Sequence, residues 1–224
     1  MTTGYRDRDV ARFGRWADSY NESRLQRLVF APLQEATLRE AADAVAEPRA
    51  ILDVGCGTGL LLAQAAERFP GARLTGVDAA EEMIRVARAS APAEAPVEFQ
   101  PATAEALPFA PGTFDLVLTT MSFHHWADQP AALREVRRVL APGGLFALTD
   151  AFPVGWLRFV FARSRHGRFN RPPELIAMLR EAGLPLERHA PVPGFGGTVQ
   201  VVLARAATSG LRPPADAGGR DASG

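Results

Sequence analysis

Short apolar runs alternate with longer amphipathic stretches along the first two thirds of the chain. Apolar runs of the buried-strand type lie at 51–54, 74–77, 97–100, 114–119 and 145–149. Helical periodicity fills the intervening stretches at 60–69, 81–89 and 130–140. Strands that alternate with helices of this length form a parallel sheet covered on both faces, and right-handed crossovers make it doubly wound. The pattern therefore predicts an α/β fold.

The pattern changes after residue 149. A helix is expected at 173–182, and two strands at 186–190 and 199–204 flank a short Pro/Gly turn. Because so short a turn reverses the chain, these two strands should be antiparallel. Upstream, the sequence Pro142-Gly143-Gly144 is expected to stop the preceding helix and form a turn before the strand at 145–149.

These elements divide the chain into a main domain and flanking segments. We expect an N-terminal helical lid at 1–46, laid over the sheet, and the α/β domain at 47–206. Within that domain, 151–171 would be an insertion on the substrate side. The small and polar residues of 207–224 predict a disordered tail.

The amino-acid composition excludes several classes of function. The 224 residues, 47% of them hydrophobic, suit one globular domain with a full core. Basic and acidic residues number 25 each, whereas proteins that grip nucleic acid usually carry a basic excess, so no nucleic-acid partner is expected. The chain has no lysine, which excludes Schiff-base chemistry. One cysteine and no clustered ligand pattern argue against a disulfide and against a metal site.

Targeting features are also lacking. The charged N-terminal segment has no apolar core of the secretory type, and no apolar run approaches the roughly 18 residues of a membrane span. We therefore expect a cytoplasmic protein without a transmembrane segment. The oligomeric state stays open.

The strongest chemical pattern is ILDVGCGTG at 51–59, in which a strand ends in a glycine turn that opens a helix. Main-chain N–H groups and the positive helix end face a ligand bound at such a turn. A dinucleotide fingerprint requires glycine or alanine where Leu60 stands, which disfavours NAD and FAD. Asp78 ends the second strand about 20 residues later, where a carboxylate accepts both hydroxyls of a ribose.

Several stretches occur together in a family order. They are ILDVGCGTG, GVDAAEEMIRVAR, AEALPFAPGTFDLV, SFHHWAD and LREVRRVLAPGG, within about residues 50–150. The chain resembles the class I S-adenosylmethionine (SAM)-dependent methyltransferases, and within them the ubiquinone/menaquinone and small-molecule group. The resemblance implies a seven-stranded, mostly parallel sheet of order 3-2-1-4-5-7-6, with one antiparallel strand and helices on both faces.

The resemblance also implies a set of cofactor-binding residues. They are Tyr20, Asp53, Gly55, Cys56, Gly57, Thr58, Gly59, Asp78, Ala79, Met83, Thr103, Ala104, Glu105, Thr120 and Met121. Asp53 and the glycines would hold the methionine part of SAM, Asp78 the ribose, and 103–105 the adenine edge. Two positions depart from the family. Thr103 replaces a common Asp, which predicts weaker adenine recognition, and Ala80 replaces a common Ser, which removes a helix cap worth about 1 kcal/mol.

Two adjacent histidines follow the fourth strand, at the ligand-binding edge of such a sheet. His124 and His125 are candidates for a general base or for substrate positioning, because the unperturbed pKa of histidine lies near neutrality. The alternative is that they only hydrogen-bond the loop. The N–H groups of the glycine turn are expected to lower the pKa of the Cys56 thiol.

The stretch 156–171 is rich in arginine and aromatic residues. Trp156, Arg158 and Phe159 are candidates for one wall of a pocket for an aromatic, anionic or quinone-like substrate. A membrane contact and a capping helix with solvated arginines, some paired with Glu174 or Glu181, are the alternatives.

Taken together, we expect a SAM-dependent enzyme that methylates an O, N or C nucleophile of a small molecule. The alternatives are a SAM-binding protein that transfers no methyl group, and a methyltransferase that acts on a macromolecule.

Overall fold

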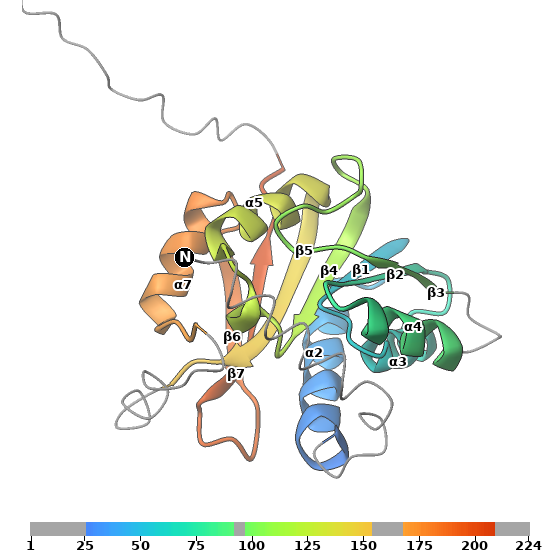
Figure 1. Cartoon of the computed structure of the whole chain (residues 1–224). Coiled ribbons are helices and arrows are strands. Elements are labelled where there is room, and N and C mark those ends of the chain that lie inside the picture. Colours follow the sequence, from blue (N-terminus) through green and yellow to red (C-terminus); the bar gives the residue numbers. More distant parts are fainter. Residues whose placement is uncertain (1–25, 92–96, 154–167, 209–224) are drawn as a thin grey trace, which may run out of the picture.

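The computed structural model describes residues 26–91, 97–153 and 168–208. Its centre is a seven-stranded sheet of order β3-β2-β1-β4-β5-β7-β6 (Figure 1). All pairs from β3 to β5 are parallel, and β7 runs antiparallel to both of its neighbours. The predicted strand order and the single reversed strand are confirmed. The strands are β1 (Ala50–Val54), β2 (Arg73–Asp78), β3 (Val97–Pro101), β4 (Phe114–Thr120), β5 (Leu140–Ala151), β6 (Leu186–Pro191) and β7 (Val199–Arg205).

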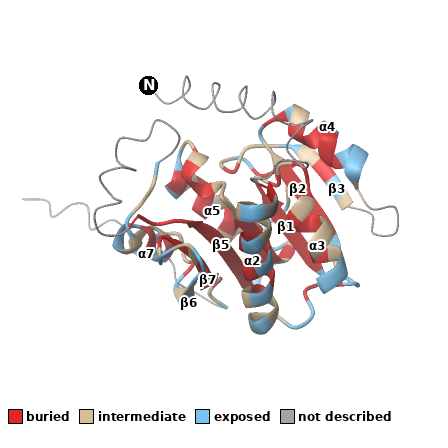
Figure 2. Ribbon diagram, turned by 90° about the horizontal axis from the view of Figure 1, so that it is seen from below, coloured by how far each residue is buried: buried red, intermediate tan, exposed pale blue. Residues whose placement is uncertain are grey.

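Helices cover both faces of the sheet, so the central strands are buried (red in Figure 2). The helical elements are η1 (Gln26–Phe30), α2 (Ala31–Ala44), α3 (Leu60–Arg68), α4 (Glu81–Ser90), η2 (Phe123–His125), α5 (Gln129–Val139) and α7 (Pro172–Glu181). One core packs under α2, α3 and α4, and the other under α5 and α7. No helix in these described segments is long and apolar enough to cross a membrane.

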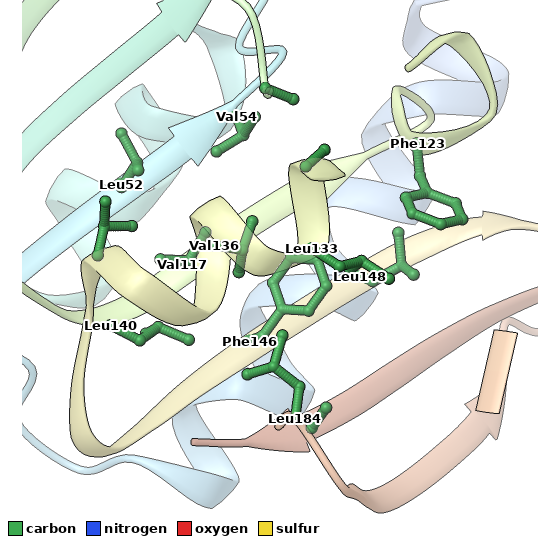
Figure 3. Close-up of a cluster of buried hydrophobic side chains, with 14 of the residues drawn as sticks. Leu52, Val54, Val117, Phe123, Leu133, Val136, Leu140, Phe146, Leu148 and Leu184 are labelled. Carbon is green, nitrogen blue, oxygen red and sulfur yellow. The ribbon is translucent and has the colours of Figure 1, made fainter. Parts of the chain in front are cut away.

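Strand β5 shows how one sequence serves both cores. Phe146 and Leu148 enter the core beneath α5, where they meet Leu133 (Figure 3), whereas Leu145 and Ala147 enter the other core. Successive side chains of a strand point to opposite faces, and all four are fully buried. Each buried leucine or phenylalanine contributes about 2 kcal/mol. A continuous apolar strand is therefore the expected sequence for a sheet covered on both sides.

The prediction of a turn at Pro142-Gly143-Gly144 is wrong, because these residues lie inside β5. Leu140 already pairs with Phe114, and Leu145 pairs with Leu116, so the extra residues form a bulge. The N–H of Gly143 donates to Ala206 O at 3.0 Å, and Ala206 N donates to Gly144 O at 2.8 Å. Pairing with the chain after β7, remote in sequence, holds this segment within β5 as a bulge, in which Gly143 has a φ of 77°.

Helix α2 packs into the core and does not stand apart from it. Leu33, Leu38 and Ala41 are buried against the sheet, and Arg188 of β6 lies 3.0 Å from Glu40. The helix is laid over the sheet as expected. The division into lid, main domain, insertion and tail stays a prediction, because 1–25, 154–167 and 209–224 lie outside the described residues.

Candidate functional site

The glycine turn leaves β1 and opens α3 at the carboxyl edge of the sheet. The N–H groups of Gly55 and Cys56 both donate to Val77 O, at 2.8 and 3.0 Å, which ties the turn to the end of β2. Gly59 has a φ of 82° at the N-cap position, where a side chain would be strained. The first turn of α3 therefore presents its main-chain N–H groups at this edge.

The glycines of this turn are needed for different reasons. A Cβ at Gly59 would lie 2.7 Å from the ring of Phe99, and one at Gly55 would lie 1.9 Å from Ser122 Oγ. These two glycines let neighbouring segments pack closely. Gly57 has a φ of 54° but faces open space, with no atom within 4 Å of a Cβ. Gly57 is the glycine that leaves room for a ligand.

Asp53 is a buried carboxyl directly below the turn. It is 2% exposed, and its Oδ1 has no hydrogen-bond partner among the described residues. Burial, reinforced by the charge of Asp78, raises its pKa from 3.8 to about 8. A buried acceptor without a donor is rare in proteins and costs free energy. Among the described residues, no donor therefore satisfies this oxygen of Asp53.

A small cavity of about 50 Å³ adjoins Asp53. Its lining brings together the glycine turn, the end of β4 and the start of α2, from Phe30, Gln34, Asp53, Gly55, Cys56, Gly57, Thr58, Leu60, Leu61 and Thr120. Sequence analysis did not select Gln34. Its Oε1 accepts from Gln64 Nε2 at 2.9 Å and from Gln26 Nε2 at 3.4 Å. Because the amide oxygen is held by these two bonds, the side chain of Gln34 is fixed at the edge of the cavity.

Asp78 lies where β2 ends, as predicted, and is held by main-chain donors. Its Oδ2 accepts from Gly57 N at 2.9 Å and its Oδ1 from Ala80 N at 2.8 Å. Burial raises its pKa, while these N–H groups act in the opposite direction. Ala80 provides no side-chain cap for α4, and the carboxylate of Asp78 accepts from the N–H of this N-cap residue itself, just before the helix begins. The residue as a whole is half-buried.

The expectation that the turn lowers the pKa of Cys56 is wrong. Burial, together with the nearby carboxyls of Asp53 and Asp78, raises the pKa of the thiol well above its usual range. Desolvation of a 7% exposed side chain outweighs the main-chain N–H that favours the thiolate. Cys56 is a small buried neutral group in contact with the cavity.

The residues predicted at the adenine edge gather beside Asp78. Ala102 N donates to Asp78 O at 3.0 Å, which places Thr103 and Ala104 next to the end of β2. Ala104 is buried. On α4, the predicted Met83 is also buried, at 2% exposure, and Ala79 connects Asp78 to that helix.

The side chain of Glu105, predicted to bind the cofactor, forms hydrogen bonds with the main chain in this structure. Its Oε1 accepts from Ala127 N at 2.8 Å and from Asp128 N at 3.1 Å. The carboxylate therefore ties the loop after β3 to the segment that precedes α5. This contact fixes the loop that was predicted to lie at the adenine edge.

The segment after β4 approaches the glycine turn. Thr120 lines the cavity and lies within 3.3 Å of the hydroxyl of Thr37 on α2. Met121 adopts a φ of 53°, unusual for a residue with a side chain, and its N–H donates to Thr149 O at 2.8 Å. The backbone thereby turns sharply, and Ser122 packs on Gly55.

The two histidines differ in their surroundings. His124 is buried, and its Nδ1 lies 2.7 Å from Oδ1 of Asp150, which is 1% exposed. Asp150 Oδ2 also accepts from His124 N at 3.1 Å. His125 is partly exposed, and its ring contacts that of His124 at 4.0 Å between centroids. Sequence analysis missed Asp150, although its position at the carboxyl end of a strand was a usable signal.

The remaining predicted residues lie outside the described part of the chain. They are Tyr20, Trp156, Arg158 and Phe159. At the end of the arginine-rich stretch, Arg171 forms an ion pair with Glu174 at 2.5 Å, one of the pairings that the sequence left open. Phe169 stacks on His124 with centroids 4.5 Å apart.

Comparisons with known proteins agree with this architecture. Residues 52–148 match a family model described as a methyltransferase domain. The chain is similar to the demethylmenaquinone methyltransferase of Thermus thermophilus, with 44% identity over 118 residues, 51% of this chain and 53% of that one. The match thus spans about half the length of that relative.

A longer match joins the chain to the ubiquinone biosynthesis O-methyltransferase of a Methylobacterium species. The identity is 35% over 208 residues, 79% of this chain and 81% of the relative. A solved SAM-dependent methyltransferase from Thermotoga maritima superposes with a TM-score of 0.65 at 21% identity, over 86% of this chain and 97% of that one. This likeness shows a shared fold.

Proposed function

Because the chain belongs to the SAM-dependent methyltransferase family, we propose that it transfers the methyl group of SAM to a nucleophilic atom of a small molecule. SAM is the cofactor of this family. The observation that carries the proposal is the buried Asp53, whose Oδ1 accepts no hydrogen bond from any described residue and which lines the same cavity as Gly57. A ligand with a cationic amino group would donate a charge-assisted hydrogen bond to this carboxyl oxygen.

The residues of the candidate site suit the parts of SAM. Asp53 and the amide NH₂ of Gln34 would hold the amino and carboxylate groups of its methionine part, aided by the N–H groups of the glycine turn. The carboxylate of the half-buried Asp78 would accept from the ribose hydroxyls. Thr103 and Ala104 would lie along the adenine edge, with Met83 beneath it.

Once bound, the cofactor supplies an electrophilic methyl group, so the protein has to orient an acceptor and exclude water. The acceptor would enter at the carboxyl ends of β4 and β5, where Thr120, His124 and Asp150 lie. The names of the relatives support a small, quinone-like acceptor. Trp156, Arg158 and Phe159 remain proposed members of its pocket.

The test follows the labelled methyl group. Purified full-length protein is incubated with methyl-labelled SAM and an extract of its host cells, and the extract is then separated into organic-soluble, protein and nucleic-acid fractions. We expect label in the organic-soluble fraction, with mass spectrometry identifying the product. The Asp78→Ala variant should transfer little label. The Asp43→Asn variant, changed at an exposed position of α2, should match the wild type.

Two outcomes would favour the alternatives. Label in precipitated protein or nucleic acid would replace the small-molecule acceptor by a macromolecule while keeping the chemistry. Bound SAM, measured by calorimetry, without transfer to any fraction would indicate a SAM-binding protein that is not a methyltransferase.

A further inference from the structure

We propose that His124 and Asp150 form an acid–base pair that selects a hydroxyl acceptor, with His124 Nε2 as the base and Asp150 as the residue that orients it. This inference rests on the proposed function and makes it more specific. An acceptor with a neutral O–H must lose its proton to become a good nucleophile, whereas a thiolate or a free amine needs no base of this kind.

The hydrogen bonds around Asp150 determine which nitrogen of His124 is free. Oδ1 of Asp150 accepts from His124 Nδ1 and from Ala151 N, both at 2.7 Å, and Oδ2 accepts from His124 N at 3.1 Å. A carboxylate satisfied in this way only accepts, so Nδ1 carries the proton and Nε2 keeps its lone pair. No described residue forms a hydrogen bond with Nε2.

Packing keeps the imidazole ring in this orientation. The ring of Phe169 is stacked nearly parallel to that of His124, at an interplanar angle of 19°. Arg168 N donates to His124 O at 2.7 Å, and Gln129 Nε2 donates to both Phe123 O and Arg168 O. The segment that precedes α7 therefore holds the histidine from one side while Asp150 of β5 holds it from another.

The pair lies at the correct edge of the sheet for methyl transfer. His124 follows Ser122, which packs directly on Gly55, and Thr120 lines the cavity beside Asp53. Asp150 comes one residue after Thr149, the β5 partner of Thr120. Both members of the pair are thus carried by strand ends that adjoin the proposed site of the methionine part.

The step balances without a further reactant. The O–H bond of the acceptor breaks and its proton moves to Nε2, while the acceptor oxygen takes the methyl group and the electron pair of the C–S bond stays on sulfur. The imidazolium is stabilised by the carboxylate of Asp150 and later releases its proton to water. The charged groups that face His124 in the described structure are Asp150, the neighbouring His125 and, through its main chain, Arg168.

One readout needs no enzymatic activity. The chain has four histidines, so ¹⁵N-labelled imidazoles can be resolved by NMR, and the His124→Asn variant assigns the His124 signal. We expect the Nδ1–H tautomer in the wild type and loss of that preference in Asp150→Asn. The His189→Gln variant, changed at an exposed histidine of β6, should leave the His124 signals in place. An Nε2–H tautomer in the wild type would overturn the proposal.

The second readout uses methyl transfer with ¹³C-methyl SAM and cell extract. In the His124→Asn variant, the asparagine amide still donates to Asp150 from near the Nδ1 position, but the Nε2 base is missing. The affinity for SAM should therefore stay within about twofold of the wild type, while turnover should fall by about 10²–10⁴-fold. The loss should shrink as pH rises, because the acceptor then ionises in solution. Asp150→Asn should show a smaller loss of at least about tenfold, and His189→Gln none.

The identity of the methylated product shows whether the His124–Asp150 proposal alone fails or the proposed function fails as well. A methoxy carbon signal that disappears with His124→Asn supports the pair. A methyl group on nitrogen or carbon, or a loss that is equal at every pH, would refute the pair and leave the proposed function standing. No transfer by the wild type despite bound SAM would refute both.

Discussion

Replacing Asp53 by asparagine should stabilise the cofactor-free protein at neutral pH and weaken its affinity for SAM. Burial and the nearby Asp78 raise the pKa of the Asp53 carboxyl from 3.8 to about 8. At neutral pH, folding therefore takes up a proton on a group that is ionised in the unfolded chain. An amide has the same shape and no such cost.

The magnitude follows from the two pKa values. Because the folded-state pKa is the higher one, the contribution of Asp53 to stability is fully present below about pH 4 and is lost as pH rises to about 8. The slope between these limits is about 1.4 kcal/mol per pH unit. Between about pH 4 and pH 7, the free energy of unfolding of the wild type should therefore fall by up to about 4 kcal/mol. The Asp53→Asn variant should show no such fall.

The assay is urea unfolding of both proteins at several pH values between about 5 and 8, with Asp43→Asn as the control for an exposed carboxylate. The stability difference between Asp53→Asn and the wild type should grow with pH, whereas the control should follow the wild type. Binding of SAM at pH 7 should release about 0.9 proton from the wild type, measured by calorimetry in two buffers, and none from Asp53→Asn. Parallel stability curves would refute the reasoning.

Four further substitutions test the rest of the site. Asp78→Ala should weaken SAM binding at least about tenfold, because it removes charge-assisted hydrogen bonds, and an unchanged calorimetric affinity would contradict the ribose assignment. Gly59→Ala places a Cβ 2.7 Å from Phe99 at a φ of 82°, so it should lower the free energy of unfolding in urea by about 2–3 kcal/mol. Gly57→Ala should lower it by only about 1 kcal/mol, because a Cβ there meets no atom, and should instead reduce the affinity for SAM. Thr37→Val leaves the buried Thr149 hydroxyl without its partner at 2.7 Å and should cost about 1–3 kcal/mol; a change below about 0.5 kcal/mol would show that this hydrogen bond is dispensable.

Residues that belong to a recognisable motif could be predicted, and residues that gain a role only from their contacts in the fold were missed. The glycine turn and Asp78 stand at strand ends 21 positions apart, the spacing expected of a ribose-binding acid, and Gly57 N donates to Asp78. Asp150 also lies at the end of a strand, but neither it nor Gln34 belongs to such a motif, and the fold alone brings them to His124 and Gln64. The role of each of these two residues depends on which side chain the fold places next to it.

By itself the hydrophobic period of the sequence determined the succession of helices and strands and predicted a doubly wound sheet, while the strand order came from the resemblance to the methyltransferase family. Tertiary structure decided the rest. It holds Pro142-Gly143-Gly144 within β5 as a bulge by pairing Gly143 with Ala206, and it gives His124 its partner Asp150. It also raises the pKa of Cys56 by burial, where local N–H groups predicted a decrease. Desolvation and hydrogen bonding depend on what surrounds a group in space, and only the folded chain defines those surroundings.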